Sequence, residues 1–197
     1  FVGSRLIERL VSEGHHVKAL ARSAKASESV SLLSATPING DLENISRWKG
    51  ALVGCDAVVH CAAPVEFWGA WERFEKEIVV ATRQLAEASA DAQVPKFIHI
   101  SSESVLQDLA PIVNIDESHA YPTQPNSYYG MAKKLAELEL LQSETSMNIV
   151  ILRPAFVWGE NSKAIFELVE RTKSGSFIWA SEGKIPFESV HLSLIHI

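Results

Sequence analysis

Ala57-Val58-Val59-His60-Cys61-Ala62 is an almost unbroken apolar run of strand length, and it opens the stretch that decides the fold. After it, apolar residues recur every three or four positions, which predicts a helix with one buried face. These residues are Trp71, Phe74, Ile78, Ala81, Leu85 and Ala88. A second apolar run, 97–100, follows as a strand. This order predicts two parallel strands joined by a crossover helix.

The same alternation extends in both directions from this unit. Before it, an apolar helical stripe that starts at Leu6 and ends at Gly14 is followed by a predicted strand over 16–21. The other predicted elements are a strand over 38–40, a helix over 44–52, an irregular stretch over 103–126, a helix containing Tyr129 and a strand over 148–152. We therefore expect an α/β fold with a doubly wound parallel sheet over residues 1–153, and the start of a small C-terminal substrate lobe over 154–191.

The composition favours a globular protein with a small-molecule partner. Of its 197 residues, 47% are hydrophobic and 21% charged, which allows one sizeable core. The net charge of −6 is spread out with no basic run, so nucleic-acid binding is not expected. Cys55 and Cys61 lack metal-ligand company, which favours free thiols and a cytoplasmic location. Arg153 interrupts the apolar run 148–158, so no stretch reaches membrane-spanning length.

Both ends of the chain suggest a piece of a longer protein. The chain begins with Phe1, and residues 192–197 resemble a translated sequencing adapter, so we expect them to be a scar outside the fold. A strand upstream of Phe1 is expected at the centre of the sheet. Without it two neighbouring strands lose a hydrogen-bonding partner, so the isolated chain is expected to be poorly folded.

Tyr129 and Lys133 are four residues apart at the start of a predicted helix, so the phenol and the ammonium share one face. A free tyrosine has a pKa of about 10, and a neighbouring cation lowers that pKa toward a value useful for acid–base catalysis. Ser102 follows the strand over 97–100, where its hydroxyl would fix a substrate oxygen beside the phenol.

Five motifs in order resemble the extended branch of the short-chain dehydrogenase/reductase family, which includes NAD-dependent epimerases and dehydratases, 3β-hydroxysteroid dehydrogenases and dihydroflavonol reductases. They are Gly40-Asp41-Leu42, His60-Cys61-Ala62-Ala63, Phe97-Ile98-His99-Ile100-Ser101-Ser102, Tyr129-Gly130-x-x-Lys133-x-x-Ala136-Glu137 and Leu152-Arg153-Pro154. The resemblance covers residues 1 to about 191. It implies a Rossmann-type sheet, a nicotinamide dinucleotide cofactor and a homodimer packed through the Tyr129 helix.

The resemblance also implies catalytic roles. Tyr129 would be the acid/base, Lys133 would lower the pKa of Tyr129 and bind the nicotinamide ribose, and Ser102 would hydrogen-bond the substrate oxygen. The alternative for Tyr129 is an aromatic residue packed on the sheet with Lys133 solvated, and the alternative for Ser102 is a strand-end cap. No metal site is expected.

Gly3 resembles the third glycine of the family's phosphate-binding Gly-x-x-Gly-x-x-Gly, with the first two upstream of Phe1. Arg22 and Ser23 follow the strand over 16–21. The presence of an arginine and the absence of a carboxylate at this position favour NADP as the cofactor, with NAD as the alternative. The alternative for Arg22 itself is an ordinary solvated residue.

The remaining predicted cofactor residues come from the same resemblance. Asp41, followed by Leu42, would accept from the adenine amino group, although a turn or helix-entry role for Asp41 is the rival interpretation. Ala62 and Ala63 would line the adenine ribose. Pro154 of the Leu-Arg-Pro motif completes the predicted cofactor-binding set.

Two departures from the family pattern bear on the substrate. The segment 78–82 lacks the family's helix asparagine, and 104–107 lacks the Val-Tyr-Gly of nucleotide-sugar epimerases. Phe67 and Trp68 would favour an apolar substrate such as a steroid, terpenoid or flavonoid if they face the cleft. The alternative is that they cover the following helix, as Trp71 is expected to do. His60 and His99 are expected to be satisfied core or rim histidines.

The sequence therefore predicts an NADP-preferring oxidoreductase that transfers hydride between nicotinamide and a carbinol or carbonyl carbon of an apolar small molecule. A nucleotide-sugar epimerase or dehydratase is the second hypothesis. A non-catalytic NADP-binding regulatory or scaffold protein is the third.

Overall fold

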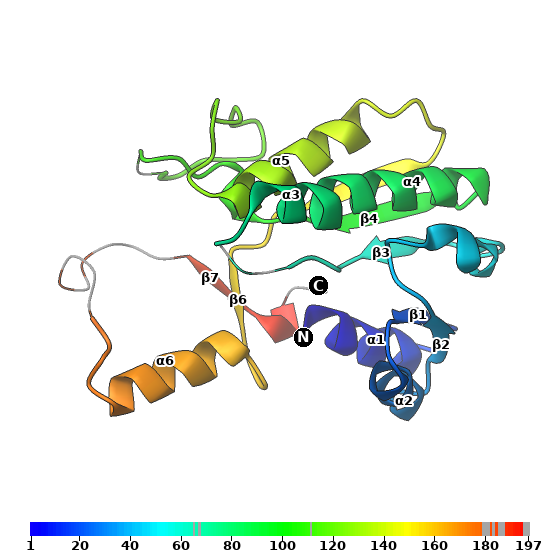
Figure 1. The fold of residues 1–197 in the computed structure, drawn as a ribbon, viewed down its shortest axis with the longest axis horizontal. Helices are drawn as coiled ribbons and strands as arrows, with labels where there is room; N and C mark the ends of the chain where they lie inside the picture. Colours follow the sequence, from blue (N-terminus) through cyan, green and yellow to red (C-terminus); the bar gives the residue numbers. More distant parts are fainter. Residues whose placement is uncertain are drawn as a thin grey trace.

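The computed structural model describes residues 1–64, 66, 68–110, 112–178, 182, 184 and 188–194. Helices and strands alternate along the chain, as the sequence predicts (Figure 1). They are α1 (Val2–Ser12), β1 (Lys18–Ala21), α2 (Ala24–Leu32), β2 (Thr36–Asn39), the 3₁₀ turns Ile45–Arg47 and Lys49–Leu52, β3 (Val58–His60), α3 (Trp71–Phe74), the π-helix Glu75–Val80, α4 (Ala81–Asp91), β4 (Lys96–Ile100), the 3₁₀ turn Glu103–Val105, α5 (Tyr128–Leu141), β5 (Asn148–Leu152), β6 (Phe156–Trp158), α6 (Lys163–Lys173), β7 (Ser189–His191) and the 3₁₀ turn Leu192–Leu194.

All strand pairs described are parallel, which confirms the predicted α/β class. β3, β4 and β5 form one sheet in the order β3-β4-β5, and β1 pairs with β2 in another. Figure 1 shows α3, α4 and α5 along one face of the three-stranded sheet, whereas α1 and α2 lie with β1 and β2 below β3 in that view. Within the described residues no strand bridges β1 and β3, which is the position where the sequence predicts an unfilled strand.

The helical segment after β3 confirms the apolar stripe that the sequence predicts. Phe74, Ile78, Ala81, Leu85 and Ala88 are all buried. The segment runs as α3, a π-helix and α4 without a break. A π-helix has a wider turn than an α-helix and shifts the residues that follow it around the axis. The buried face is nevertheless continuous: Phe74 and Ile78 pack against α5, and Leu85 and Ala88 belong to the cluster that contains Phe97 of β4.

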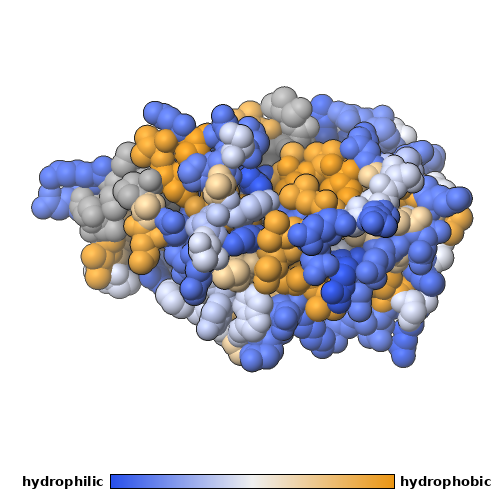
Figure 2. Space-filling model, turned by 90° about the horizontal axis from the view of Figure 1, so that it is seen from above, coloured by the Kyte–Doolittle hydropathy of each residue, from blue (hydrophilic) through white to orange (hydrophobic). Residues whose placement is uncertain are grey.

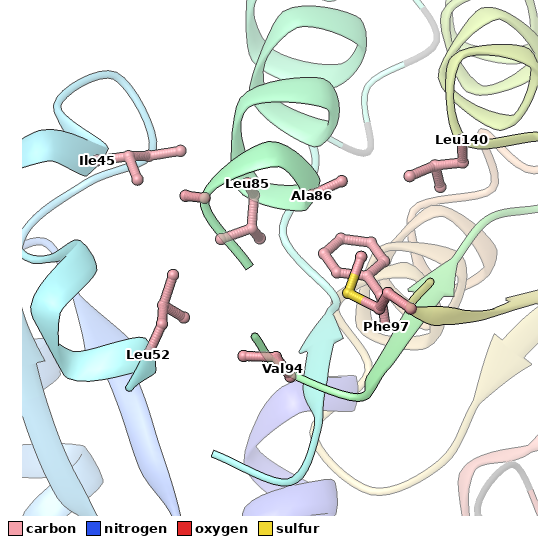
Figure 3. Close-up of a cluster of buried hydrophobic side chains, with 9 residues drawn as sticks. Ile45, Leu52, Leu85, Ala86, Val94, Phe97 and Leu140 are labelled. Carbon is pink, nitrogen blue, oxygen red and sulfur yellow. The ribbon is translucent and has the colours of Figure 1, made fainter. Parts of the chain in front are cut away.

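The larger core cluster lies between this helix and the sheet. Phe97 of β4, fully buried, and Leu140 of α5 pack with Leu85 of α4, and Ile45 and Leu52 close the cluster from the two 3₁₀ turns (Figure 3). These side chains come from five segments far apart in sequence. Burial of this apolar surface is the main term that holds the helices on the sheet.

The helix predicted over 44–52 is wrong, because two 3₁₀ turns occupy this stretch. Trp48 lies between them, and its indole nitrogen donates to the carbonyl of Asp41 at 2.7 Å. The indole also packs so closely on Gly40 that a Cβ there would lie 2.5 Å from it. This anchoring pulls the chain back after one turn, so an α-helix does not continue. The strand predicted over 38–40 is displaced as well, and lies at Thr36–Asn39.

The C-terminal part has its own small sheet. β6 pairs in parallel with β7, and α6 lies between them in sequence. The division of the chain at residue 153 stays a prediction. Of the predicted scar, Leu192–Leu194 form a 3₁₀ turn with Leu192 buried, and residues 195–197 lie outside the described part. Among the described helices, none has the length and apolarity needed to span a bilayer.

Candidate active site

Ser102 lies just beyond the carboxyl end of β4 and begins the 3₁₀ turn Glu103–Val105. Its hydroxyl accepts from the Ser104 amide at 3.2 Å and donates to the Ser104 hydroxyl at 3.1 Å. The amide of Glu103 donates to the carbonyl of Pro154 at 3.2 Å, which ties this turn to the chain after β5. The capping role offered as an alternative for Ser102 is therefore present, and it also fixes the side chain in place.

Tyr129 lies in the first turn of α5, which Ser127 caps by accepting from the Gly130 amide at 3.0 Å. The phenol is 9% exposed and hydrogen-bonds to Ser102. Gly130 makes this approach sterically feasible, since a Cβ at this position would lie 2.4 Å from the Ser104 carbonyl oxygen. The structure thus brings together the serine and the tyrosine that the sequence singles out.

The pKa of Tyr129 is raised in this structure, whereas the sequence predicts that Lys133 lowers it; the role of Lys133 toward the phenol stays a prediction. Burial raises the pKa of the phenol, and the hydrogen bond with Ser102 offsets only part of that rise. The Lys133 ammonium instead donates to the carbonyl of Ile100 at 2.8 Å. The Lys133 ammonium thus lies at the carboxyl end of β4.

Lys133 is itself the most deeply buried cation of the site, at 2% exposed. Burial lowers its pKa to about 8, while Cys61 and Glu137 favour its charged form. Cys61 follows β3, and burial raises the pKa of its thiol to about 11 although Lys133 acts in the opposite direction. The sequence analysis did not give Cys61 a place in the site; its position between the strand and the Ala62-Ala63 pair was the available signal.

The start of α1 lies beside this group. A Cβ on Gly3 would lie 4.0 Å from the Cβ of Cys61, so the first turn of α1 reaches the carboxyl end of β3. No side chain caps this helix at Phe1. Ala63 packs against the cluster that contains Tyr129, and Ala62 is exposed. Gly3 therefore lies near Cys61 and Ala63 near Tyr129, and the roles of Gly3, Ala62 and Ala63 toward a cofactor stay predictions.

The other predicted cofactor residues follow β1 and β2. Arg22 is exposed, and within the described ranges its guanidinium forms no hydrogen bond or ion pair. Ser23 next to it caps α2 by accepting from the Ala26 amide at 3.2 Å. Because the carboxyl ends of parallel strands share one edge of a sheet, Arg22 lies on the edge where a dinucleotide binds in this class of fold.

Asp41 takes the turn role that the sequence analysis offered as the rival. Its Oδ1 accepts from the amides of Glu43 at 3.0 Å and Asn44 at 2.9 Å. Leu42 beside it packs against the larger core cluster. The role of Asp41 toward adenine stays a prediction, and it would have to use the other carboxylate oxygen.

The two core histidines differ in how their polar atoms are satisfied. His60 is buried and shares a hydrogen bond of 3.0 Å with the hydroxyl of Thr82, as expected for a core histidine. His99 is fully buried, but neither of its ring nitrogens has a partner in the described part of the chain, so the prediction is wrong on that point. Burial lowers the pKa of His60 to about 3 and that of His99 to about 2. The described residues hold no group of His, Cys, Asp and Glu that could bind a metal.

The aromatic segment after β3 does not behave as either sequence hypothesis expects. Trp68 is 87% exposed, so it neither lines a cleft nor covers the following helix. Phe67 lies outside the described residues. Trp71 packs against the cluster around Tyr129, with its ring 5.8 Å from that of Tyr128, which confirms its assignment to the helix stripe.

An apolar cavity of about 420 Å³ lies in the irregular stretch beyond Ser102. Its lining is mostly aliphatic, and the residues are Leu106, Asp108, Ala110, Ile112, Val113, Ile115, His119, Ala120 and Pro122. Figure 2 shows the molecule from the side of α3–α5, where apolar and hydrophilic side chains are interspersed. The cavity follows the 3₁₀ turn of Ser102 in the chain, which places apolar surface in the segment next to the candidate catalytic residues.

A parallel sheet with a serine, a tyrosine and a lysine grouped beyond its carboxyl edge defines a protein of the extended short-chain dehydrogenase/reductase class. The model of the NAD dependent epimerase/dehydratase family matches residues 1–187, and the chain belongs to that family.

Two curated relatives cover almost the whole chain. The 4-hydroxy-2-methyl-3-oxo-4-farnesyl-3,4-dihydroquinoline-1-oxide ketoreductase of Stigmatella aurantiaca is 32% identical over 98% of this chain and 58% of the relative. The decarboxylating sterol-4-alpha-carboxylate 3-dehydrogenase of Dictyostelium discoideum is 31% identical over 100% of this chain and 61% of the relative. The chain thus spans about three fifths of the length of these relatives.

Solved structures show the same fold. The crystal structure of gox2253 superposes with a TM-score of 0.81 at 26% identity, over 98% of this chain and 60% of the other. The UDP-glucuronic acid 4-epimerase of Bacillus cereus, solved with NAD, superposes with a TM-score of 0.80 at 24% identity, over 98% of this chain and 67% of the other. At this identity the epimerase comparison establishes the fold alone.

Proposed function

We propose that the protein is an NAD(P)-dependent oxidoreductase that transfers hydride between nicotinamide and a carbinol or carbonyl carbon of an apolar small molecule. The observation that carries this proposal is the hydrogen bond between Ser102 and Tyr129 one turn before Lys133. These groups can hold a substrate oxygen and exchange a proton with it. Membership of the NAD dependent epimerase/dehydratase family supports a nicotinamide cofactor.

The residues near the site fit such a cofactor. The first turn of α1 has no side-chain cap, so its amides are available to a phosphate group. An ammonium has three donors, and Lys133 uses one of them on Ile100, which leaves donors for ribose hydroxyls. The exposed guanidinium of Arg22 and the hydroxyl of Ser23 suit a 2′-phosphate, which favours NADP over NAD.

The chain's own residues have separate tasks in this scheme. A bound nicotinamide supplies or accepts the hydride. Tyr129 gives its proton to the substrate oxygen during reduction and takes it back during oxidation, while Ser102 donates a hydrogen bond to the same oxygen. The raised pKa of Tyr129 keeps the phenol protonated, which suits a proton donor in carbonyl reduction. Lys133 holds positive charge at the site while the phenol loses its proton.

Two observations support an apolar substrate. The cavity of about 420 Å³ beyond Ser102 has a mostly aliphatic lining. The names of two relatives describe a farnesylated quinoline oxide and a sterol, both largely apolar molecules. The second candidate is a nucleotide-sugar epimerase, which membership of the NAD dependent epimerase/dehydratase family supports. The third, a non-catalytic NADP-binding scaffold, is disfavoured because Ser102, Tyr129 and Lys133 occur together.

Substitution of the phenol tests the catalytic proposal. The protein produced from the complete gene is assayed for NADPH-dependent reduction of apolar ketones, alongside Tyr129→Phe. We expect the variant to bind NADPH as the parent does and to lose activity by about two orders of magnitude or more, because only the transferable proton is removed. A parent that binds the cofactor but turns over no ketone, alcohol or nucleotide sugar would favour the scaffold hypothesis.

A further inference from the structure

Glu137 carries a fully buried carboxylate one helical turn after Lys133. Arg153 donates to it through Nε, at 3.1 Å to both oxygens, and through Nη2, at 2.7 Å to Oε2. Tyr121 donates its phenol proton to the same carboxylate, and Arg153 Nη2 lies 2.6 Å from the phenol oxygen. The guanidinium also lies over the ring of Tyr121, 4.9 Å from its centre. Glu137 is therefore held by two partners from different segments.

These partners come from the segments that surround the candidate active site. Tyr121 belongs to the irregular stretch that leads into α5, and Arg153 directly precedes Pro154, whose carbonyl accepts from the turn of Ser102. Lys134 of α5 also donates to the carbonyls of Pro122 at 2.7 Å and Thr123 at 3.2 Å. The network thus fixes the helix that carries the tyrosine and the lysine to both neighbouring segments.

Glu137 also lies on the same face of α5 as Lys133. Residues four apart on a helix share a face, with about 5–6 Å between their Cβ atoms. Lys133 is buried, and the hydrogen bond of its ammonium goes to a neutral carbonyl rather than to a carboxylate. A buried cation without a close counter-charge is costly, so a nearby fixed negative charge has a large effect on it.

We propose that Glu137 is a positioning residue whose buried carboxylate keeps Lys133 charged and α5 in register with the Ser102 turn, with Arg153 and Tyr121 holding that carboxylate in place. The consequence for catalysis rests on the proposed oxidoreductase function, whereas the consequence for the charge of Lys133 does not.

The titratable groups around Lys133 determine whether loss of Glu137 raises or lowers the pKa of Lys133. Its pKa is lowered to about 8 by burial, and Cys61 at the end of β3 and Glu137 on α5 both act to raise it. His60 on β3 and His99 on β4 are neutral, because their pKa values lie at about 3 and about 2. Tyr129 is protonated, because burial raises its pKa. Near neutral pH the thiol of Cys61 is protonated too, so Glu137 supplies the negative charge that favours charged Lys133.

The experiment compares three variants of the protein produced from the complete gene. Glu137→Gln removes the charge, and Glu137→Gln with Arg153→Met removes it without leaving an unpaired guanidinium. Glu139→Gln is the matched control, since Glu139 lies on the same helix as a partly exposed partner of Arg83 at 3.7 Å. The first readout is the alkaline limb of the activity–pH profile, measured with a ketone and NADPH or with an alcohol and NADP⁺.

We expect the alkaline limb to move to lower pH by about one unit in Glu137→Gln, because loss of the carboxylate lowers the pKa of Lys133. The shift should have the same direction but be smaller in the double variant, which also loses the positive charge of Arg153. Glu139→Gln leaves the limb in place. If Glu137→Gln alone fails to fold, the double variant carries the test. A folded double variant whose alkaline limb coincides with that of the parent would overturn the proposal.

A second readout does not require catalysis. The folded pKa of Lys133 lies below its unfolded value of about 10.4, so the unfolded state holds the proton more tightly and the free energy of unfolding rises with pH between the two values. The free energy of unfolding is plotted against pH for the double variant and for Glu139→Gln. The difference between the two curves isolates the effect of Glu137 on Lys133. The rise should begin at lower pH in the double variant, and an unchanged onset contradicts the proposal even if no substrate is ever found.

Discussion

Gly130 stands so close to Ser104 that a side-chain carbon at position 130 would lie 2.4 Å from the Ser104 carbonyl oxygen. The helix that carries Tyr129 therefore starts directly against the turn that carries Ser102. The hydrogen bond between the two candidate catalytic residues depends on this contact. Gly130 takes no part in the proposed reaction, but it allows Tyr129 to approach Ser102.

Substitution of Gly130 by Ala should force α5 away from the Ser104 backbone. We expect a loss of about 1–3 kcal/mol in the free energy of unfolding, because a backbone oxygen cannot move aside as a flexible side chain does. Activity should fall further than stability alone explains, since Tyr129 loses its place beside Ser102. Denaturant unfolding and steady-state kinetics measure the two effects.

Gly50→Ala provides the control for this comparison. A Cβ at Gly50 meets no atom within 4 Å, so its substitution should change stability by no more than about 0.5 kcal/mol. Equal effects of the two substitutions would show that the close approach of Gly130 to Ser104 does not determine stability or activity.

Arg22 should decide between the two nicotinamide cofactors. Its exposed guanidinium is free to pair with a 2′-phosphate, which NADPH carries and NADH lacks. In a fluorescence titration of the protein from the complete gene, Arg22→Ala should weaken NADPH binding by about tenfold or more and leave NADH binding unchanged. A parent protein that binds NADH more tightly than NADPH would contradict the NADP assignment.

His99 should limit stability in acid. Its folded pKa of about 2 lies below the unfolded value of about 6.5, so the unfolded state binds a proton that the folded state does not. The free energy of unfolding therefore falls as the pH drops below about 6.5, and it continues to fall until the folded pKa is reached. In His99→Leu this part of the fall should be absent, which urea unfolding at a series of pH values between about 3 and 7 measures. Parallel pH curves for parent and variant would argue against a neutral His99 in the core.

The unpaired edges of β1 and β3 predict weak cooperativity for residues 1–197 on their own. In the part of the chain that the structure describes, backbone groups on both edges lack the partner that a bridging strand would provide. Differential scanning calorimetry of this chain should show a broad, weak transition, whereas the protein from the complete gene should melt sharply. A single sharp transition of the short chain would contradict the prediction.

Elements with strong periodicity are the ones that the sequence predicts correctly. The stripe from Trp71 to Ala88 forms a helix with a buried face, and the runs over 57–62 and 97–100 contain β3 and β4. The stretch 44–52 fails, because Trp48 bonds to the Asp41 carbonyl and closes the chain into 3₁₀ turns. That contact lies outside the local pattern from which a helix is predicted.

The candidate site was also predicted only in part. Spacing alone puts Tyr129 and Lys133 on one face of a helix, and strand order puts Ser102 beside them. The Tyr121–Glu137–Arg153 network was not predicted, although the four-residue step from Lys133 to Glu137 was visible in the sequence. Its partners are 16 residues from Glu137 on either side, so only the folded chain brings them together.

The sequence by itself determined the succession of strands and helices from β3 to β5, the class of the fold and the residue types that can perform proton transfer, because these depend on local periodicity and on motif order. Tertiary structure decided the direction of the pKa shift of Tyr129, the acceptor of Lys133 and the partners of Glu137. Burial and charge at a side chain depend on groups distant in sequence, and their positions are defined only once the chain has folded.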